Sequence, residues 1–151
     1  MKILVAYFSR TGKTEKAAKA IAEAVDGEIY RIRTEKEYPA GFLQTVGELK
    51  KEFKTGEKPA LKGDLPKAEL YDKILLGFPV WAGNLPPAVI GFLEMLDLKG
   101  KDVYPFYTSY GGAPRKADGV IEAACGANVH EFLNASRPKK LKLDKWLGFE
   151  D

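Results

Sequence analysis

The sequence is poor in the residues that build disulfides and metal sites. Its 151 residues include one cysteine, Cys125, and one histidine, His130. A single thiol excludes an internal disulfide framework and a clustered-thiol metal site, and no set of partner ligands accompanies the histidine. We therefore expect Cys125 to be a small buried residue at a helix end and His130 to be structural.

Long apolar runs and a strong charge imbalance are also missing. No apolar run approaches the ~20 residues that cross a bilayer, and charges soon follow the first one, unlike a secretory signal. The 24 basic and 21 acidic residues give a net charge of +3. This is too mild, and too scattered along the chain, for a nucleic-acid surface. We expect one cytoplasmic domain over residues 1–151, with neither nucleic acid nor membrane as a partner.

What the chain does contain is a regular alternation of short apolar runs and helical patterns. Apolar runs predict strands at 3–8, 28–33, 72–78, 101–108 and 128–133. Helical spacing predicts helices at 14–25, 41–54, 86–96, 114–125 and 141–147, with a polar connection at 55–71. Alternation of this kind is typical of an α/β fold, a doubly wound parallel sheet with helices on both faces. Ligands of such sheets bind outside the carboxyl ends of the strands.

The loop after the first predicted strand has the composition of an anion site. It reads Ser9, Arg10, Thr11, Gly12, Lys13 and Thr14, and a helix follows at once. Backbone N–H groups at a helix start, the helix dipole and hydroxyl donors together favour a phosphate. A nucleoside-triphosphate loop would need glycine where Tyr7 stands, and no buried strand ends in an acidic residue for magnesium. An ordinary turn with capping hydroxyls is the alternative.

Two further loops leave the same predicted edge of the sheet. The second comprises Pro79, Val80, Trp81, Ala82, Gly83 and Asn84, and the third comprises Thr108, Ser109, Tyr110, Gly111 and Gly112. Each combines an aromatic ring with glycine, which allows close backbone approach to a ligand. Trp81 could stack on a flat ring or close the loop onto the core. One phosphate loop and two aromatic loops suit a phosphorylated, flat, aromatic cofactor, of which FMN is the simplest.

These segments resemble the flavodoxin family. The resemblance rests on Val5 to Thr14 with Ala18 and Ile21, and on Gly77-Phe78-Pro79-Val80-Trp81. It continues through Pro86, residues 92–94, Gly100-Lys101 and residues 105–109. It implies five parallel strands in the order 2-1-3-4-5, with FMN on the three loops.

Carried over by resemblance, the phosphate contacts fall on the first loop and the ring and ribityl contacts on the other two. Trp81 and Tyr110 are the residues expected on the two faces of the isoalloxazine. A backbone carbonyl within 82–84 could accept a hydrogen bond from the flavin N5, and Tyr38-Pro39 either borders the pocket or is structural. Lys13 stands where many relatives have asparagine, and the mildly basic chain departs from the family's acidic surface.

The resemblance implies an FMN electron carrier, a monomer or weak dimer that serves redox partner proteins or a small redox substrate. The alternative is an FMN-dependent NAD(P)H:quinone-type oxidoreductase, which needs a second pocket that no obvious insertion provides. A related module that has lost its flavin is a third possibility. A phosphoacceptor receiver is excluded, because its acidic positions hold Phe8-Ser9 and Phe78-Pro79.

Overall fold

The computed structural model describes residues 1–36, 47, 51–52, 54–56, 58–109, 111–115, 117–137 and 141–148. Five strands form a parallel sheet in the order β2-β1-β3-β4-β5, and a sixth, β6, also pairs with β4. The strands are β1 (Ile3–Tyr7), β2 (Glu28–Arg31), β3 (Lys73–Pro79), β4 (Asp102–Thr108), β5 (Asn128–Val129) and β6 (Leu133–Asn134). The predicted doubly wound α/β fold and its strand order are confirmed, with β6 as an addition.

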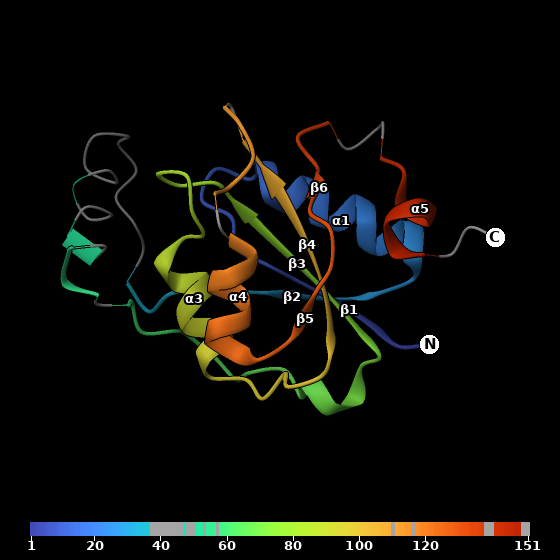
Figure 1. Cartoon of the computed structure of the whole chain (residues 1–151), viewed down its shortest axis with the longest axis horizontal. Coiled ribbons are helices and arrows are strands. Elements are labelled where there is room, and N and C mark those ends of the chain that lie inside the picture. Colours follow the sequence, from blue (N-terminus) through green and yellow to red (C-terminus); the bar gives the residue numbers. More distant parts are fainter. Residues whose placement is uncertain are drawn as a thin grey trace.

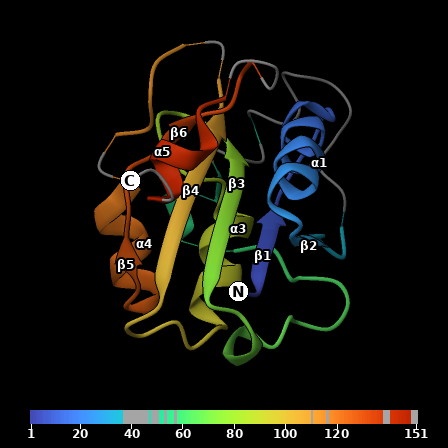
Figure 2. The same cartoon turned by 90° about the vertical axis from the view of Figure 1, so that its right-hand side faces the viewer.

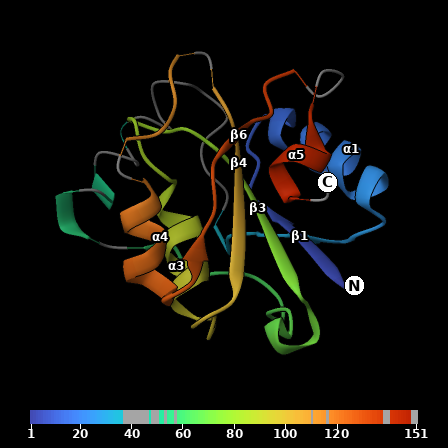
Figure 3. The same ribbon diagram turned by 45° about the vertical axis from the view of Figure 1, so that its right-hand side comes forward.

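Helices cover both faces of this sheet. They are α1 (Lys13–Val25), α3 (Pro87–Glu94), α4 (Ala117–Cys125) and α5 (Leu143–Leu147). Figure 1 shows α3 and α4 on one side of the strands, and Figure 3 shows α1 and α5 together on the other. The described crossover helices α1, α3 and α4 therefore lie on one face of the sheet or the other, as the alternating sequence pattern predicts.

The central strand β1 explains why two cores form. Leu4, Ala6 and the following Phe8 point to the face covered by α3 and α4. Ile3 and Val5 point to the opposite face, against the small residues of α1. Successive side chains of a strand point to opposite faces, so a continuous apolar run is buried on both sides.

Helix α1 is amphipathic and ends at a left-handed residue. Its buried stripe consists of Thr14, Ala17, Ala18, Ile21 and Ala22. The left-handed C-cap is Asp26, with φ 52°. Gly27 serves another purpose, because a Cβ there would come within 3.2 Å of the Ile3 carbonyl. The glycine lets the chain turn closely over β1.

The carboxyl ends of the three central strands lie at one edge of the sheet. Figure 2 shows the arrowheads of β1, β3 and β4 pointing the same way. Backbone hydrogen bonds continue past the strand ends: Phe8 N–H donates to Gly77 O at 3.0 Å, and Val80 N–H donates to Thr108 O at 3.0 Å. The three predicted loops therefore start side by side.

Several predicted bounds differ from the structure. The strand expected at 28–33 ends at Arg31, and Ile29 is exposed. The helix expected from 114 begins at Ala117, and the one from 141 begins at Leu143. The polar connection at 55–71 contains a 3₁₀ turn, η1 (Ala68–Leu70), and Leu61 forms a bridge with Thr34. Most of the helix expected at 41–54 lies outside the described residues, as does Tyr38-Pro39.

The largest correction concerns the strand expected at 128–133. It is two short strands, β5 and β6, separated by residues 130–132, and both pair with β4. The break has a physical cause outside the segment, because the Glu131 carbonyl accepts a hydrogen bond from Trp146 Nε1 at 2.7 Å. Phe132 packs its ring edge-on against Phe78. These long-range contacts compete with the hydrogen bonds that residues 130–132 would make to β4 in a continuous strand.

Candidate functional site

The loop after β1 forms an uncapped helix start. Gly12 is the N-cap of α1 and adopts φ 97°, a left-handed conformation that favours glycine. It has no side chain with which to cap the helix, so the N–H groups of the first turn are directed at the loop. Ser9 Oγ accepts a hydrogen bond from Gly12 N–H at 3.0 Å, which closes the loop. The structure thus brings together all six predicted residues from Ser9 to Thr14.

The start of α1 is electrostatically prepared for an anion. The acidic residue of its first turn, Glu15, is paired with Lys19 at 2.9 Å and with Arg31 at 3.4 Å. The hydrogen bond from Lys19 holds the pKa of Glu15 below its usual value, with the positive charges of Lys19 and Arg31 adding to the effect. Its negative charge is therefore offset, and the helix dipole is left to act on the loop.

A hydroxyl contact joins the first loop to the third. Thr14 Oγ1 lies 2.7 Å from Thr108 Oγ1, and both side chains are buried. Thr108 is the last residue of β4 and the first of the third loop. The start of α1 is thus fixed against the end of β4.

The second loop is a two-residue hairpin. Trp81 and Asn84 exchange two backbone hydrogen bonds, each 2.9 Å long, and the residues between them, Ala82 and Gly83, have φ of 50° and 76°. Positive φ at both central positions defines a type I′ turn, which glycine accommodates and alanine does at a cost. The Gly83 carbonyl accepts a hydrogen bond from Arg115 N–H at 2.7 Å, so the segment before α4 holds the hairpin tip.

The Trp81 ring packs edge-on against Phe8, the residue before the first loop. Its ring centroid lies 5.5 Å from that of Phe8 at an interplanar angle of 86°. Phe8 is buried and Trp81 is half-buried. The two interpretations of Trp81 are therefore compatible, because an indole anchored by its contact with the core still has part of its surface in solvent.

The third loop is organised by two serines. Ser109 Oγ accepts from Gly111 N–H at 3.0 Å and donates to Gly112 O at 3.1 Å. Ser109 N–H donates to Ser136 Oγ, whose hydroxyl donates back to the Ser109 carbonyl. Tyr110, expected on one face of the flavin, lies outside the described residues.

Ser136 and Arg115 position these loops, and neither was predicted. Ser136 reaches Ser109 because β6 pairs with β4, and Arg115 reaches Gly83 through its backbone N–H. No local sequence pattern marks either contact, since each joins segments far apart in the chain.

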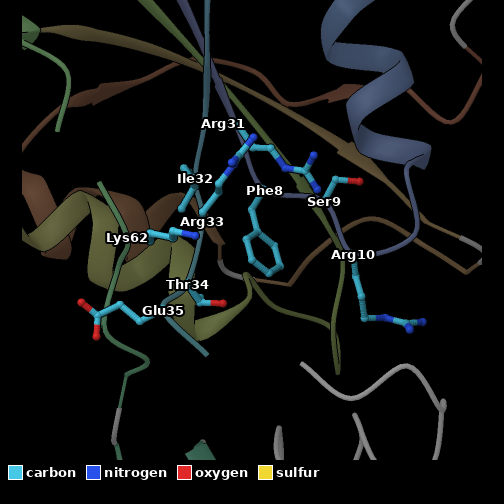
Figure 4. Close-up of a pocket in the computed structure, with 9 residues that line it drawn as sticks. All are labelled: Phe8, Ser9, Arg10, Arg31, Ile32, Arg33, Thr34, Glu35 and Lys62. Atoms are coloured by element: carbon cyan, nitrogen blue, oxygen red, sulfur yellow. The ribbon is translucent and has the colours of Figure 1, made fainter. Parts of the chain in front are cut away.

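A cavity of about 560 Å³ adjoins the first loop on its β2 side. We call it the β2-side cavity, and it is lined by Phe8, Ser9, Arg10, Arg31, Ile32, Arg33, Thr34, Glu35 and Lys62. Figure 4 shows the Phe8 ring between Arg10 on one side and Thr34, Glu35 and Lys62 on the other. Of these nine residues, only Ser9 and Arg10 belong to the predicted site.

His130 and Cys125 lie outside this edge. His130 Nε2 is 2.8 Å from Asp102 Oδ1, and its ring stacks on Tyr104 at 4.1 Å. Cys125 donates its thiol to Ile121 O at 3.2 Å, and burial raises its pKa. It is half-buried rather than fully buried. The described residues contain no group of three His, Cys, Asp or Glu able to hold a metal.

A family model for flavodoxin matches residues 2–149. The chain belongs to the flavodoxin family. It is 34% identical to a provisionally assigned flavoprotein of Bacteroides uniformis ATCC 8492, with a TM-score of 0.81 and 97% of each chain covered. It is 25% identical to a flavoprotein of Lactobacillus acidophilus NCFM solved in complex with FMN. That comparison gives a TM-score of 0.83 and covers 97% of this chain and 98% of the other.

A second comparison matches a shorter part of the chain. A 98-residue stretch, 62% of the chain, is 30% identical to an NAD(P)H dehydrogenase (quinone) of Syntrophus aciditrophicus (strain SB). The match covers 47% of that relative, so this chain aligns with about half of the relative's length.

Among the described helices, none has both the length and the apolar character of a membrane span.

Proposed function

We propose that this flavodoxin-family protein binds FMN at the carboxyl edge of the sheet and carries electrons between redox partners. The observation that carries the proposal is the coupling of three loops into one frame. Thr14 is joined to Thr108 by their hydroxyls, and Val80 is joined to Thr108 by a backbone hydrogen bond. FMN is the cofactor found in the Lactobacillus acidophilus relative, which matches this chain along nearly its whole length.

The first loop provides the phosphate site. The N–H groups at the start of α1 point to it, and Gly12 allows a bulky anion to approach because a Cβ there would meet nothing within 4 Å. The Ser9 hydroxyl accepts from Gly12 and keeps its own proton to donate. Arg10 and Lys13 add positive charge beside the dianion.

The second loop provides the ring site. Trp81 offers an indole whose orientation is set by Phe8, and stacking on it orients a flat ring. The Gly83 carbonyl accepts from Arg115 and the Asn84 carbonyl accepts from Trp81 N–H. Of the three carbonyls in 82–84, we therefore assign to Ala82 the bond to the protonated ring nitrogen.

FMN supplies the redox chemistry, and the protein supplies binding, orientation and electrostatics. The partner is a redox protein or a small redox substrate, and the protein works as a monomer or a weak dimer. The cytoplasmic location predicted above stays a prediction.

The decisive experiment is a visible spectrum of the purified protein, with mass identification of any released cofactor. Titration of FMN into the stripped protein should quench flavin fluorescence. Trp81→Ala should weaken FMN binding about fivefold, since an aromatic contact contributes about 1 kcal/mol, whereas Trp81→Phe should retain most of the affinity. A colourless protein that leaves FMN fluorescence unchanged would refute the proposal.

The second candidate function is an NAD(P)H:quinone oxidoreductase on the same scaffold. The Syntrophus aciditrophicus relative, an NAD(P)H dehydrogenase (quinone), is the observation that favours it. Steady-state oxidation of NADH or NADPH with a quinone acceptor separates the two functions. Fast turnover by the FMN-loaded protein alone supports the enzyme, and electron transfer only from a reductase supports the carrier.

A further inference from the structure

The β2-side cavity is separate from the proposed ring site. Its lining comes from the loop after β1, from residues 31–35 at and beyond the end of β2, and from Lys62. No described residue of the second or third loop is among them. Its volume of about 560 Å³ lies within the roughly 300–1,000 Å³ range of small-molecule sites. The cavity therefore adjoins the phosphate loop without belonging to the loops proposed for the ring.

The charge of the lining is strongly one-sided. Among the described residues that line the cavity, four are cationic, Arg10, Arg31, Arg33 and Lys62, and one, Glu35, is a carboxylate. Arg31 is paired with Glu15. Within the part of the chain that the structure describes, no ion pair involves Arg10, Arg33 or Lys62. Three cationic residues thus line the cavity, and none of them is bound to a carboxylate of the described residues.

The backbone fixes two of these charges opposite one another. Lys62 N–H donates to the Arg33 carbonyl at 2.8 Å, and Glu35 N–H donates to Ala60 O at 2.9 Å, on either side of the Thr34–Leu61 bridge. This antiparallel register places Arg33 directly across from Lys62. Like charges in that position repel and cost stability. An anion bound between them would attract both side chains and so offset their mutual repulsion.

The remaining lining adds an apolar floor. Phe8 and Ile32 are buried beneath the charged groups. Thr34 is buried too, and its hydroxyl already donates to Lys36 O at 2.7 Å. Guanidinium groups bind phosphate oxygens through paired N–H donors, and an apolar surface beside them suits a base or ribose. In nucleotide-binding α/β folds, an arginine near the end of the second strand accommodates a ribose phosphate.

We propose that the β2-side cavity binds a nucleotide phosphate monoester, a second phosphate site distinct from that of FMN. Arg33 and Lys62 hold the dianion, Arg10 closes the site from the phosphate loop, and the small exposed parts of Phe8 and Ile32 that line the cavity face the nucleoside. The 2′-phosphate of a phosphorylated nicotinamide dinucleotide and the phosphate of a free nucleotide are the two sources of this chemistry. The site does not require that the protein carry electrons.

The test uses FMN-saturated protein at low ionic strength, where charge interactions are least screened. Calorimetric titration with 2′,5′-ADP should give saturable binding, and adenosine should give none. Titration with 5′-AMP and with inorganic phosphate identifies the source: preference for 2′,5′-ADP indicates a dinucleotide 2′-phosphate, and equal binding of 5′-AMP indicates a free nucleotide. Binding of inorganic phosphate as tight as that of both nucleotides would contradict a nucleotide site.

Matched variants locate the site. Arg33→Gln and Lys62→Gln should each weaken 2′,5′-ADP binding about tenfold or more, because each removes a charge-assisted hydrogen bond. Arg33→Lys should lose less affinity than Arg33→Gln, because it keeps the positive charge but not the paired N–H donors. Lys145→Gln, which removes the same charge from α5 on the other face of the sheet, should change nothing. Unchanged affinity in both Arg33→Gln and Lys62→Gln overturns the proposal.

FMN itself provides the last control. If the cavity were only part of the FMN site, saturating FMN would abolish 2′,5′-ADP binding, and that result overturns the proposal. Arg33→Gln and Lys62→Gln should retain wild-type FMN affinity. A protein that binds no FMN would refute the proposed function alone, because the same titrations on that protein still decide whether the cavity binds a nucleotide.

Discussion

Thr14 Oγ1 lies 2.7 Å from Thr108 Oγ1, and this buried contact joins residues 94 positions apart in the chain. One hydroxyl donates to the other at the point where α1 begins and β4 ends. The contact makes one rigid unit of two loops that the sequence presents as independent motifs. We therefore expect loss of this contact to lower both the stability of the fold and the affinity for the cofactor.

We expect Thr14→Val and Thr108→Val each to destabilise the fold by about 1–3 kcal/mol, because each leaves the other buried hydroxyl without its partner. The double variant should cost little more than either single one, since it leaves no orphaned group. Urea unfolding of the parent, the two single variants and the double variant gives the interaction free energy between the two hydroxyls. Strictly additive losses would mean that the two hydroxyls act independently.

Gly12→Ala tests the backbone of the phosphate loop. At φ 97° an alanine is strained although nothing lies within 4 Å of its Cβ, so the cost, about 1–2 kcal/mol, arises from the backbone alone. FMN affinity should fall as well, because relief of the strain moves the N–H groups of the loop.

Gly100→Ala is the matched control for that variant. Gly100 has φ 77° and an equally open surrounding, and it lies before β4, at the opposite edge of the sheet. It should lose similar stability and keep its FMN affinity. Equal loss of FMN affinity in both variants would show that Gly12 has no special role at the site. Unfolding curves and FMN titrations give both readouts.

Gly77→Ala tests the close packing beneath the second loop. A Cβ at Gly77 would lie 2.2 Å from Phe106 Cζ, and Phe106 is fully buried and packed edge-on against Trp146. Overpacking of this kind should destabilise the fold by about 1–3 kcal/mol, measured by urea unfolding. Adding Phe106→Leu should recover part of the loss.

Gly119→Ala gives the comparison for overpacking. Gly119 lies within α4, and a Cβ there would meet nothing within 4 Å. Replacement should stabilise the protein by about 0.4–1 kcal/mol through the unfolded state. If Gly77→Ala left the free energy of unfolding unchanged, the Phe106 ring would have to be able to move aside.

The meeting of the three loops could be predicted from local patterns, because buried apolar runs mark β1, β3 and β4 and parallel strands have their carboxyl ends at one edge. The order of the strands was implied by the resemblance to the flavodoxin family. The glycine at 12 and the glycine at 83 could be recognised as turn positions, and both have positive φ.

What escaped prediction depends on contacts between distant segments. The division of residues 128–133 into two strands depends on Trp146, which takes the Glu131 carbonyl. The β2-side cavity depends on the bridge between Thr34 and Leu61, within a stretch that reads as a polar connection. Charged residues that alternate along such a stretch are ordinarily solvated, so Arg33 and Lys62 carry no local sign of facing each other.

Alkaline pH should destabilise the protein, and Tyr71 should account for part of the effect. Its hydroxyl donates a hydrogen bond to the Glu28 carboxylate, which raises the pKa of Tyr71, and burial raises it further. Burial likewise raises the pKa of Tyr7 and of Tyr30. A group whose pKa is higher in the folded state contributes stability that is complete below its unfolded pKa, roughly 10 for tyrosine. That contribution is lost as pH rises through the folded pKa.

We therefore expect the free energy of unfolding to decline above about pH 10, and to decline less steeply in Tyr71→Phe. The variant should also lose about 1 kcal/mol at pH 8, where the hydrogen bond to Glu28 is intact in the parent. Glu28→Gln should reproduce the shallower slope, because it removes the carboxylate that raises the Tyr71 pKa most. Chemical denaturation at intervals from pH 8 to about pH 12 gives the slopes. Identical slopes for the parent and Tyr71→Phe would mean that the phenol of Tyr71 ionises equally in the folded and unfolded chains.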